Sequence, residues 1–339
     1  MEQLKTASYK SQICRRKSPL NLSPQDNYLF QQEYLRNIGD CLIESHEKCI
    51  IFDSNLSVYT DEKIYQKQLT SLISGNIGRR LAAKGLVRYF MASLRSVTLI
   101  DTGCWVTDEW AQGYFHWMTE SLSKIELLRS VSELNSILLP SSLRHYHFIE
   151  ESLNLLAIPY LYLSETRFTE CKHLTTVSLD FPAGNFNCHL LKRVARRFRE
   201  RVKVDVNRGR RIWISRSEAR YRTIINEPAL KPILDRHGFE IFQMERYSLA
   251  DQIELMQQSS VIAGLHGAGL TNMLFLPTNS SVIEIRRRDD NHSNCYFSMA
   301  SALDLDYYYL LTDPMSDNLH NGNCYLDLHQ LDRLLTTLG

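Results

Sequence analysis

Short apolar runs alternate with amphipathic segments along the second half of the chain. Five of these runs have the composition of buried strands: RRIWIS (210–215), FEIFQ (239–243), SVIAG (260–264), SVIEI (281–285) and LDYYYL (305–310). Segments with helical spacing separate them, and such alternation predicts βαβ units with a parallel sheet covered on both faces. We therefore expect a Rossmann-like sheet over residues 205–312, with ligands bound beyond the carboxyl ends of its strands.

Local signals place the helices of that half. Asn226 is positioned to cap a helix, with Pro228 in its first turn and Gly238 closing its end. Further helices are predicted over 249–258 and 296–303. Each strand is thus followed by a loop and a helix, as in a doubly wound fold.

The first half carries a weaker version of the same pattern. Its predicted strands are KCIIFD (48–53), SVTLID (96–101), SILLP (136–140) and YLYL (160–163). GYFHWMTESLSKIELLRS (113–130) has the spacing of a helix. This again indicates an α/β domain, and we expect a second Rossmann-like one.

We place the connection between the two domains after a helix predicted over 186–204. The domains are then 1–204 and 205–339, with the last helix of the chain expected to pack back on the first domain. We expect residues 1–25 to be a flexible tail. The basic residues from Lys5 to Lys17 also fit a contact with an anionic membrane surface, but no apolar helix face accompanies them.

The composition narrows the class of protein. A chain of 339 residues with 44% hydrophobic and 23% charged residues is long enough for two globular domains. Its 39 Lys and Arg nearly balance its 38 Asp and Glu, which argues against a nucleic-acid-binding protein. No apolar signal segment opens the chain, and no run approaches ~18 apolar residues. We expect a cytoplasmic protein, peripheral at most to the inner face of the membrane.

The eight cysteines include no C-x-x-C pair, which favours free thiols in a reducing compartment. Four disulfides in a secreted chain are the open alternative. We find no H-E-x-x-H, no aspartate-rich calcium loop and no G-x-S-x-G, and DLD (304–306) runs straight into a predicted strand. We therefore expect neither a bound metal nor a serine nucleophile.

A glycine-rich loop, AGLHGAGLTNMLFLP (263–277), follows the third predicted strand. Glycines let backbone amides approach an anion, and a helix N-terminus favours negative charge, so the loop fits a phosphate cradle. It lacks both the G-x-G-x-x-G pattern and the lysine of a P-loop, and a plain strand-to-helix turn fits equally. His266 could donate to a phosphate oxygen or bond a neighbouring carbonyl.

Three arginines, Arg216, Arg220 and Arg222, follow the first strand of the second half and should reach the same sheet edge. Guanidinium groups bind phosphate oxygens bidentately, so their convergence suits a diphosphate; a solvated charged loop is the alternative. Glu284 stands inside a buried-looking strand. It could accept hydrogen bonds from ribose or sugar hydroxyls, or pair with Arg286 or its neighbour.

In the first half, YFHWMTES places His116 and Glu120 one helical turn apart. A carboxylate tuned by a histidine is suited to deprotonate a hydroxyl nucleophile. The alternative is an i,i+4 ion pair between Glu120 and Lys124.

The ordered combination of these motifs resembles glycosyltransferase family 61. The resemblance rests on YFHWMTE, ISRSEARYRTIINE and the stretch from LADQIELMQQ through HGAGLTN to SVIEI, within residues 100–312. It implies an inverting, generally metal-independent glycosyltransferase of the two-domain GT-B class, with a nucleotide-sugar donor and a glycan or lipid-linked glycan acceptor. No resident cofactor is implied. Lacking a secretory anchor, the chain resembles the cytosolic bacterial members associated with capsular and other surface polysaccharides.

The resemblance also implies roles by position. Arg216 and Arg222 would bind the diphosphate, Asn226 would support their loop and Glu284 would bind the donor. The glycine loop would wrap the nucleotide: His266, Gly267, Ala268, Gly269, Leu270, Thr271 and Asn272.

In the first domain, which would bind the acceptor, Glu120 would be the catalytic base with His116 beside it. The family often has Asp at position 120, which leaves the acceptor geometry open. Two other functions also remain open. One is a nucleotide-sugar epimerase, which would need no acceptor, and the other is a non-catalytic nucleotide-sugar binding protein.

Overall fold

The computed structural model describes residues 6–52, 57–59, 64–65, 97–131, 133–164, 168–204, 209–290, 293–315 and 322–338. Its contacts divide the chain into two compact units. Unit 1 comprises Met1–Ser11 and Gly39–Phe181, and unit 2 comprises Gln12–Ile38 and Pro182–Gly339. Lys5, Asp53 and Ser96, at the ends of predicted segments, lie outside the described residues.

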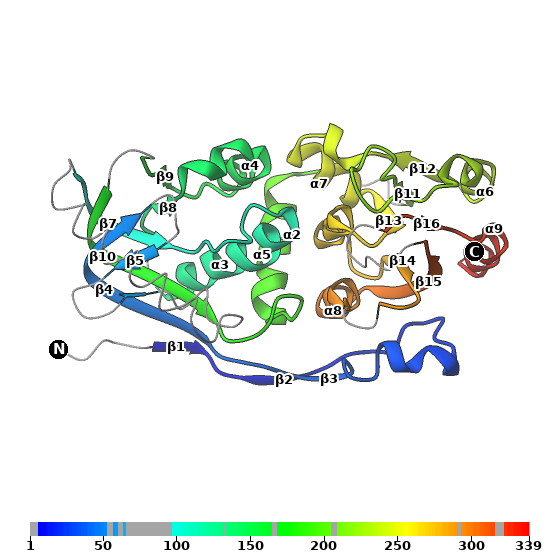
Figure 1. Ribbon diagram of the computed structural model, residues 1–339, viewed down its shortest axis with the longest axis horizontal. Coiled ribbons are helices and arrows are strands. Elements are labelled where there is room, and N and C mark those ends of the chain that lie inside the picture. Colours follow the sequence, from blue (N-terminus) through cyan, green and yellow to red (C-terminus); the bar gives the residue numbers. More distant parts are fainter. Residues whose placement is uncertain are drawn as a thin grey trace. The chain divides into compact units, whose positions relative to one another are not determined.

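Unit 2 contains the parallel sheet that the apolar pattern predicts (Figure 1). The strand order is β12-β11-β13-β14-β15-β16, and the first five strands are parallel. β16 pairs antiparallel with β15. The strands are β11 (Arg210–Ile214), β12 (Phe239–Phe242), β13 (Ser259–Leu265), β14 (Ser281–Arg287), β15 (Asp306–Pro314) and β16 (Cys324–Tyr325).

The connections of this sheet follow the predicted alternation. The helices are α5 (Cys188–Arg201), α6 (Lys231–Arg236), α7 (Leu249–Gln257), α8 (Cys295–Ala302) and α9 (Leu328–Thr337). Three 3₁₀ segments accompany them in the described residues: η5 (Glu227–Leu230), directly before α6, η6 (Met244–Arg246), between β12 and α7, and η7 (Ala268–Phe275), which begins directly after Gly267. Gly238 has φ +70° at the end of α6, a left-handed conformation that suits glycine, as predicted.

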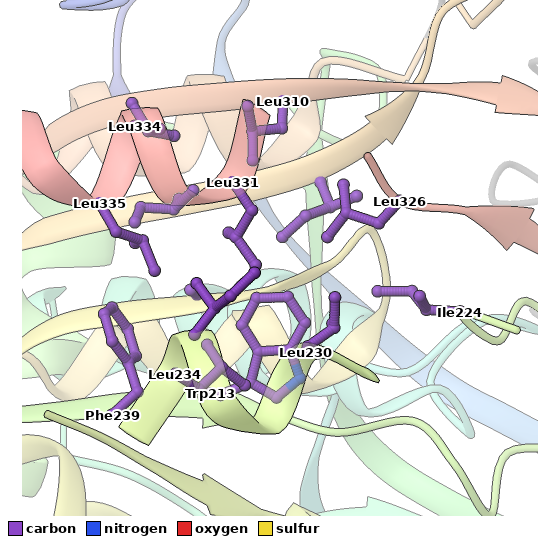
Figure 2. Close-up of a cluster of buried hydrophobic side chains, with 14 of the residues drawn as sticks. Trp213, Ile224, Leu230, Leu234, Phe239, Leu310, Leu326, Leu331, Leu334 and Leu335 are labelled. Carbon is purple, nitrogen blue, oxygen red and sulfur yellow. The ribbon is translucent and has the colours of Figure 1, made fainter. Parts of the chain in front are cut away.

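One face of the sheet forms a core with α6 and α9. Trp213 of β11 packs there with Leu234 of α6 and with Leu331 and Leu335 of α9, all fully buried (Figure 2). The prediction that the last helix packs on the first domain is therefore wrong. Its leucines complete the core of unit 2 because their helical spacing forms one apolar stripe.

The other face is covered by α5, α7, η7 and α8, which contact one another. Phe198 of α5 packs edge-on against Phe275 of η7, with ring centroids 5.3 Å apart, and Arg199 donates to the carbonyl of Leu276. For this reason α5 belongs to unit 2, and the division of the chain falls after Phe181 rather than after residue 204.

Residues 12–38 also belong to unit 2. They form β2 (Gln12–Arg15) and β3 (Leu35–Ile38), paired antiparallel, with the 3₁₀ segment η1 (Pro24–Leu29) between them. Phe30 is fully buried against Phe297 and Tyr309. The expected tail is therefore wrong for residues 6–25, because aromatic burial and strand pairing order this segment.

Unit 1 is built on a mixed sheet of order β6-β5-β4-β10-β7-β8-β9, with β1 also on β4. β10, β7, β8 and β9 are parallel, whereas β4 pairs antiparallel with β10, β5 and β1. The strands are β1 (Thr6–Tyr9), β4 (Cys41–Phe52), β5 (Ser57–Tyr59), β6 (Ile64–Tyr65), β7 (Val97–Trp105), β8 (Ile137–Leu139), β9 (Tyr160–Tyr162) and β10 (Phe168–Leu179).

The helical segments of unit 1 lie between its parallel strands along the chain. They are α2 (Tyr114–His116), η3 (Trp117–Ser121), α3 (Leu122–Val131), η4 (Ser141–His145) and α4 (His147–Leu155). The α/β class is thus confirmed, but the sheet of unit 1 is mixed, which departs from the Rossmann-like domain expected there. Sequence reasoning missed β10 because single apolar residues in its FTECKHLTTVSL segment are mostly three positions apart, which fits neither a continuous apolar run nor a period of two. No helix in the described residues is long and apolar enough to cross a membrane.

Candidate functional site

The order of the strands in unit 2 marks where a ligand should bind. Numbered along the chain, the five parallel strands run 2-1-3-4-5, because β12 and β13 flank β11. In doubly wound sheets of this order the ligand site lies outside the carboxyl ends of the first and third strands, where the direction of winding reverses. Those two strands are β11 and β13, which lead into the arginine loop and the glycine loop.

Arg216 joins these two loops. Its Nε and Nη2 donate to the carbonyls of Arg222 and Tyr221, each at 2.9 Å. On the other side its guanidinium lies so close to Gly267 that a Cβ at residue 267 would overlap Nη1. Position 267 is therefore glycine to admit the arginine, and not because of its φ of 168°, which is ordinary extended backbone.

A second guanidinium belongs to the same place. Arg222 has φ +56°, a strained left-handed conformation for this residue, and its Nε is buried without a hydrogen-bond partner among the described residues. Burial lowers the pKa of Arg216, and the charge of Arg222 lowers it further. Two repelling cations with an unmet buried donor form a site that a polyanion would stabilise. Arg220, in contrast, is exposed and stacks over the ring of Tyr221.

The glycine loop offers only its first part to a ligand. His266 and Gly269 are half-buried and Ala268 is exposed, whereas Leu270, Thr271 and Asn272 are buried. The amides at the start of η7 have no partner within the helix, as at any helix N-terminus, and are the donors available to an anion.

The buried part of the loop has internal roles. Asn272 donates from Nδ2 to Oε1 of Gln252 on α7 at 2.8 Å. This ties the loop to the helix that precedes β13. The structure therefore favours backbone amides over the side chains of Leu270, Thr271 and Asn272 as ligand contacts, and their predicted role in binding remains untested.

Glu284 lies beneath the loop with its side chain fully buried. Its Oε1 contacts Nδ1 of His266, and its Oε2 accepts a hydrogen bond from the hydroxyl of Tyr307. The ion pair expected with Arg286 or its neighbour is not formed by direct contact, although Arg286 acts on this carboxylate through its charge. A direct donor contact by Glu284 remains a prediction, and its burial favours an indirect role through His266.

Asn226 and Glu227, which follow the arginine loop in sequence, anchor its end through hydrogen bonds. The prediction that Asn226 caps the helix is wrong for its side chain, which makes no capping hydrogen bond. It pairs instead with the backbone of Leu326 through two hydrogen bonds of 2.8 and 3.0 Å. Glu227, which sequence reasoning did not single out, accepts from Nε1 of Trp213 and from the hydroxyl of Ser215. A carboxylate directly after the arginine-rich loop was the signal available for it.

The candidate base in unit 1 lies on an interrupted helix. A π turn, η3, spans Trp117–Ser121 between α2 and α3. π turns are rare and frequent at functional sites, because the extra residue redirects side chains. Nδ1 of His116 lies 3.1 Å from Oε1 of Glu120, while Lys124 pairs instead with Asp108. The expected alternative of a Glu120–Lys124 pair is therefore not observed.

The electrostatics of this pair favour a charged histidine. Burial would lower the pKa of His116, but the hydrogen bond and charge of Glu120 and the charge of Asp108 raise it overall. The ring of Trp110 lies tilted against His116 with centroids 5.6 Å apart, and Trp110 is half exposed. The pair is therefore held firmly and still reachable from solvent on the side of the histidine.

The described residues contain no group of three His, Cys, Asp or Glu side chains that could hold a metal ion. None of the eight cysteines, all of which lie in the described residues, forms a disulfide. The sulfurs of Cys14 and Cys188 lie 3.8 Å apart.

Comparison with known proteins places these motifs in one family. The family model described as glycosyltransferase 61 matches residues 114–283, which are half of the chain. An EGF domain-specific O-linked N-acetylglucosamine transferase of Drosophila melanogaster is 32% identical over 91 residues, which are 26% of this chain and 17% of that protein. The proteins of the same name in Mus musculus and Gallus gallus are 29% and 28% identical over 102 residues, or 29% of this chain. The matches span less than a fifth of these relatives.

Proposed function

Because this chain belongs to the glycosyltransferase 61 family, we propose that it transfers a sugar from a nucleotide-sugar donor to an acceptor hydroxyl, with unit 2 binding the donor. One observation carries the proposal: Arg216, Arg222 and the glycine loop meet at the switch point between β11 and β13. Cationic groups and free amides at this edge match a diphosphate in charge and in hydrogen bonding.

The proposed reaction is a single displacement with inversion. The acceptor oxygen attacks the anomeric carbon, the bond from that carbon to the diphosphate oxygen breaks, and Glu120 takes the acceptor proton. The leaving diphosphate gains negative charge, which the two arginines, His266 and the amides of the loop stabilise in place of a metal. His116 keeps the carboxylate of Glu120 oriented through its hydrogen bond.

We further propose the GT-B class that the resemblance implies, with the acceptor bound by unit 1. The relatives are named for transfer of O-linked N-acetylglucosamine to EGF domains. For this chain we propose a glycan acceptor, free or lipid-linked, in the synthesis of a capsular or other surface polysaccharide at the cytoplasmic face of a membrane. EDTA treatment tests the metal-independent mechanism, since a metal-dependent transferase loses its activity.

The test is isothermal titration of the whole chain with UDP, GDP, CDP and dTDP. We expect one of them to bind the chain, and Arg216→Ala to weaken that binding by about 10²-fold through loss of charge-assisted hydrogen bonds. Arg236→Ala is the matched control, because Arg236 is exposed and pairs with Asp332 on α9. If none of the four bound, or if the two variants behaved alike, the donor site would be misassigned.

The same proteins separate transfer from the other functions. Mass analysis of the nucleotide sugar after incubation without acceptor would detect an epimerase as a changed sugar on the same nucleotide. Tight binding with no turnover and no hydrolysis under any glycan acceptor would identify a binding protein.

A further inference from the structure

The cluster of side chains next to the glycine loop contains a carboxylate that is fully buried. Glu284 stands on β14 with a fully buried side chain and holds His266 from below. Tyr307 of β15 donates to the second oxygen of the same carboxylate. A carboxylate is a costly group to bury, and it is kept where its charge is matched.

We propose that Glu284 is a positioning residue that acts through His266: it accepts a hydrogen bond from Nδ1 and so orients the imidazole, and Nε2, once protonated, donates a hydrogen bond to the diphosphate. This rests on the proposed function, because it assigns the diphosphate as the ligand of His266. The contact between Nδ1 and the carboxylate fixes which edge of the ring faces inward. Nε2 then lies on the opposite, outer edge, where the side chain is partly exposed.

The charge of the cluster supports this assignment. Burial would raise the pKa of Glu284, but the charge and hydrogen bond of His266 and the charge of Arg286 lower it overall. The carboxylate therefore stays ionised. An ionised carboxylate can only accept a hydrogen bond from Nδ1–H, which leaves Nε2 as the nitrogen available to a ligand.

The other groups of the cluster do not compete for this proton. Burial raises the pKa of Tyr296 and of Tyr307 well above the ordinary range, and it also raises the pKa of Cys295. These groups remain neutral near pH 7, and the arginines remain charged. The groups around the imidazole are Glu284 and Arg286 of β14, Tyr307 of β15, Cys295 and Tyr296 of α8, and Arg216 and Arg222 of the arginine loop.

Binding of a nucleoside diphosphate should then draw a proton from solvent onto Nε2 whenever the imidazole is neutral in the free protein. No covalent bond forms, and the proton is the only atom exchanged. Titration of the chain with UDP, GDP, CDP and dTDP at about pH 8, in buffers that differ in ionisation enthalpy, measures this uptake as the slope of heat against that enthalpy.

For the wild-type chain we expect an uptake that approaches about one proton as the pH rises. Glu284→Gln keeps the size of the side chain but removes its charge, and should lose the uptake and weaken binding by about tenfold. Tyr307→Phe is the matched control, since it removes the other hydrogen bond to this carboxylate and leaves the charge. It should keep the uptake.

The outcomes separate the two proposals. Binding with no proton uptake in the wild type, or full uptake in Glu284→Gln, overturns the role of Glu284 and leaves the donor site standing. Absence of binding by all four nucleotides overturns both. If Glu284→Gln does not fold, nitrogen NMR of the wild-type imidazole, assigned with His266→Gln, decides: a ring without a proton on Nδ1 contradicts the proposal.

Discussion

The two candidate regions of this protein are built on opposite principles. The pair His116 and Glu120 is local, since both residues stand on one helix and meet at 3.1 Å across a π turn. The candidate donor region of unit 2 instead gathers residues from three strands: Arg216 after β11, the glycine loop after β13 and Glu284 within β14. A helix brings neighbours in sequence together, whereas a parallel sheet brings together residues that are far apart.

The two regions also differ in how many other residues support their side chains. The helical pair keeps one side open to solvent and depends on few other residues. The donor region depends on a layer of buried groups, including Glu227, Glu284 and Tyr307, that hold the exposed ones. We therefore expect substitutions in the helix to change the chemical step and those in unit 2 to change binding first.

The largest effect should come from Glu120→Gln. It removes the proposed base while keeping the shape, and should lower the rate of transfer by about 10³-fold with unchanged binding of the nucleoside diphosphate. Single-turnover kinetics and calorimetry measure the two effects separately. His116→Asn is the matched variant and should lower the rate of transfer less. If it lowered the rate more than Glu120→Gln, the histidine would be the base.

A tenfold or larger loss of nucleotide affinity is expected from Gly267→Ala. The new Cβ would displace the guanidinium of Arg216, and with it a charge-assisted contact worth about 1.5–3 kcal/mol. Gly269→Ala serves as the control, because its Cβ would meet only the apolar Cγ2 of Ile214, at 2.8 Å. Equal losses of affinity in the two variants would show general damage to the loop rather than displacement of the arginine.

Asn226→Ala should separate support from binding. It removes two hydrogen bonds to the backbone of Leu326, with an expected cost of about 1–3 kcal/mol in the free energy of unfolding. Nucleotide affinity should change far less than in Arg216→Ala. Urea unfolding followed by calorimetry on the same samples measures both, and a selective loss of affinity would instead make Asn226 a ligand contact.

The smallest effects should appear in the pH dependence of the free energy of unfolding. The two regions should lose stability in opposite directions of pH. The pKa of His116 is raised above its ordinary 6.5, so its pair stabilises unit 1 at low pH and this contribution is lost as the pH rises through the folded value. The pKa of Glu284 is lowered below its ordinary 4.5, so its contribution is present above that value and is lost as the pH falls.

Melting curves of two variants test these signs. The amount by which His116→Asn lowers the melting temperature below that of the wild type should be larger at about pH 5.5 than at about pH 8.5. The corresponding loss of melting temperature in Glu284→Gln should become smaller as the pH falls below about 4. Deficits that do not depend on pH would mean that neither pair contributes through its charge.

Much of unit 2 could be predicted from the chain because each of its signals is local. The apolar runs of β11 to β15 are short and continuous, and Gly238 ends a helix as glycine does. Unit 1 was predicted less well, since the long strands β4 and β10, which pair antiparallel with each other, contain many polar residues and no regular apolar period. The apolar pattern of a half-exposed strand resembles that of a loop with scattered hydrophobic residues.

The amino-acid sequence by itself determined the α/β class and the family, because these depend on composition, spacing and the order of motifs. The tertiary structure decided the rest. It placed α9 and residues 12–38 in unit 2, brought Arg216 against Gly267, and buried Glu284 under His266. Contacts between distant residues depend on strand order and packing, and neither is encoded in any short stretch of the chain.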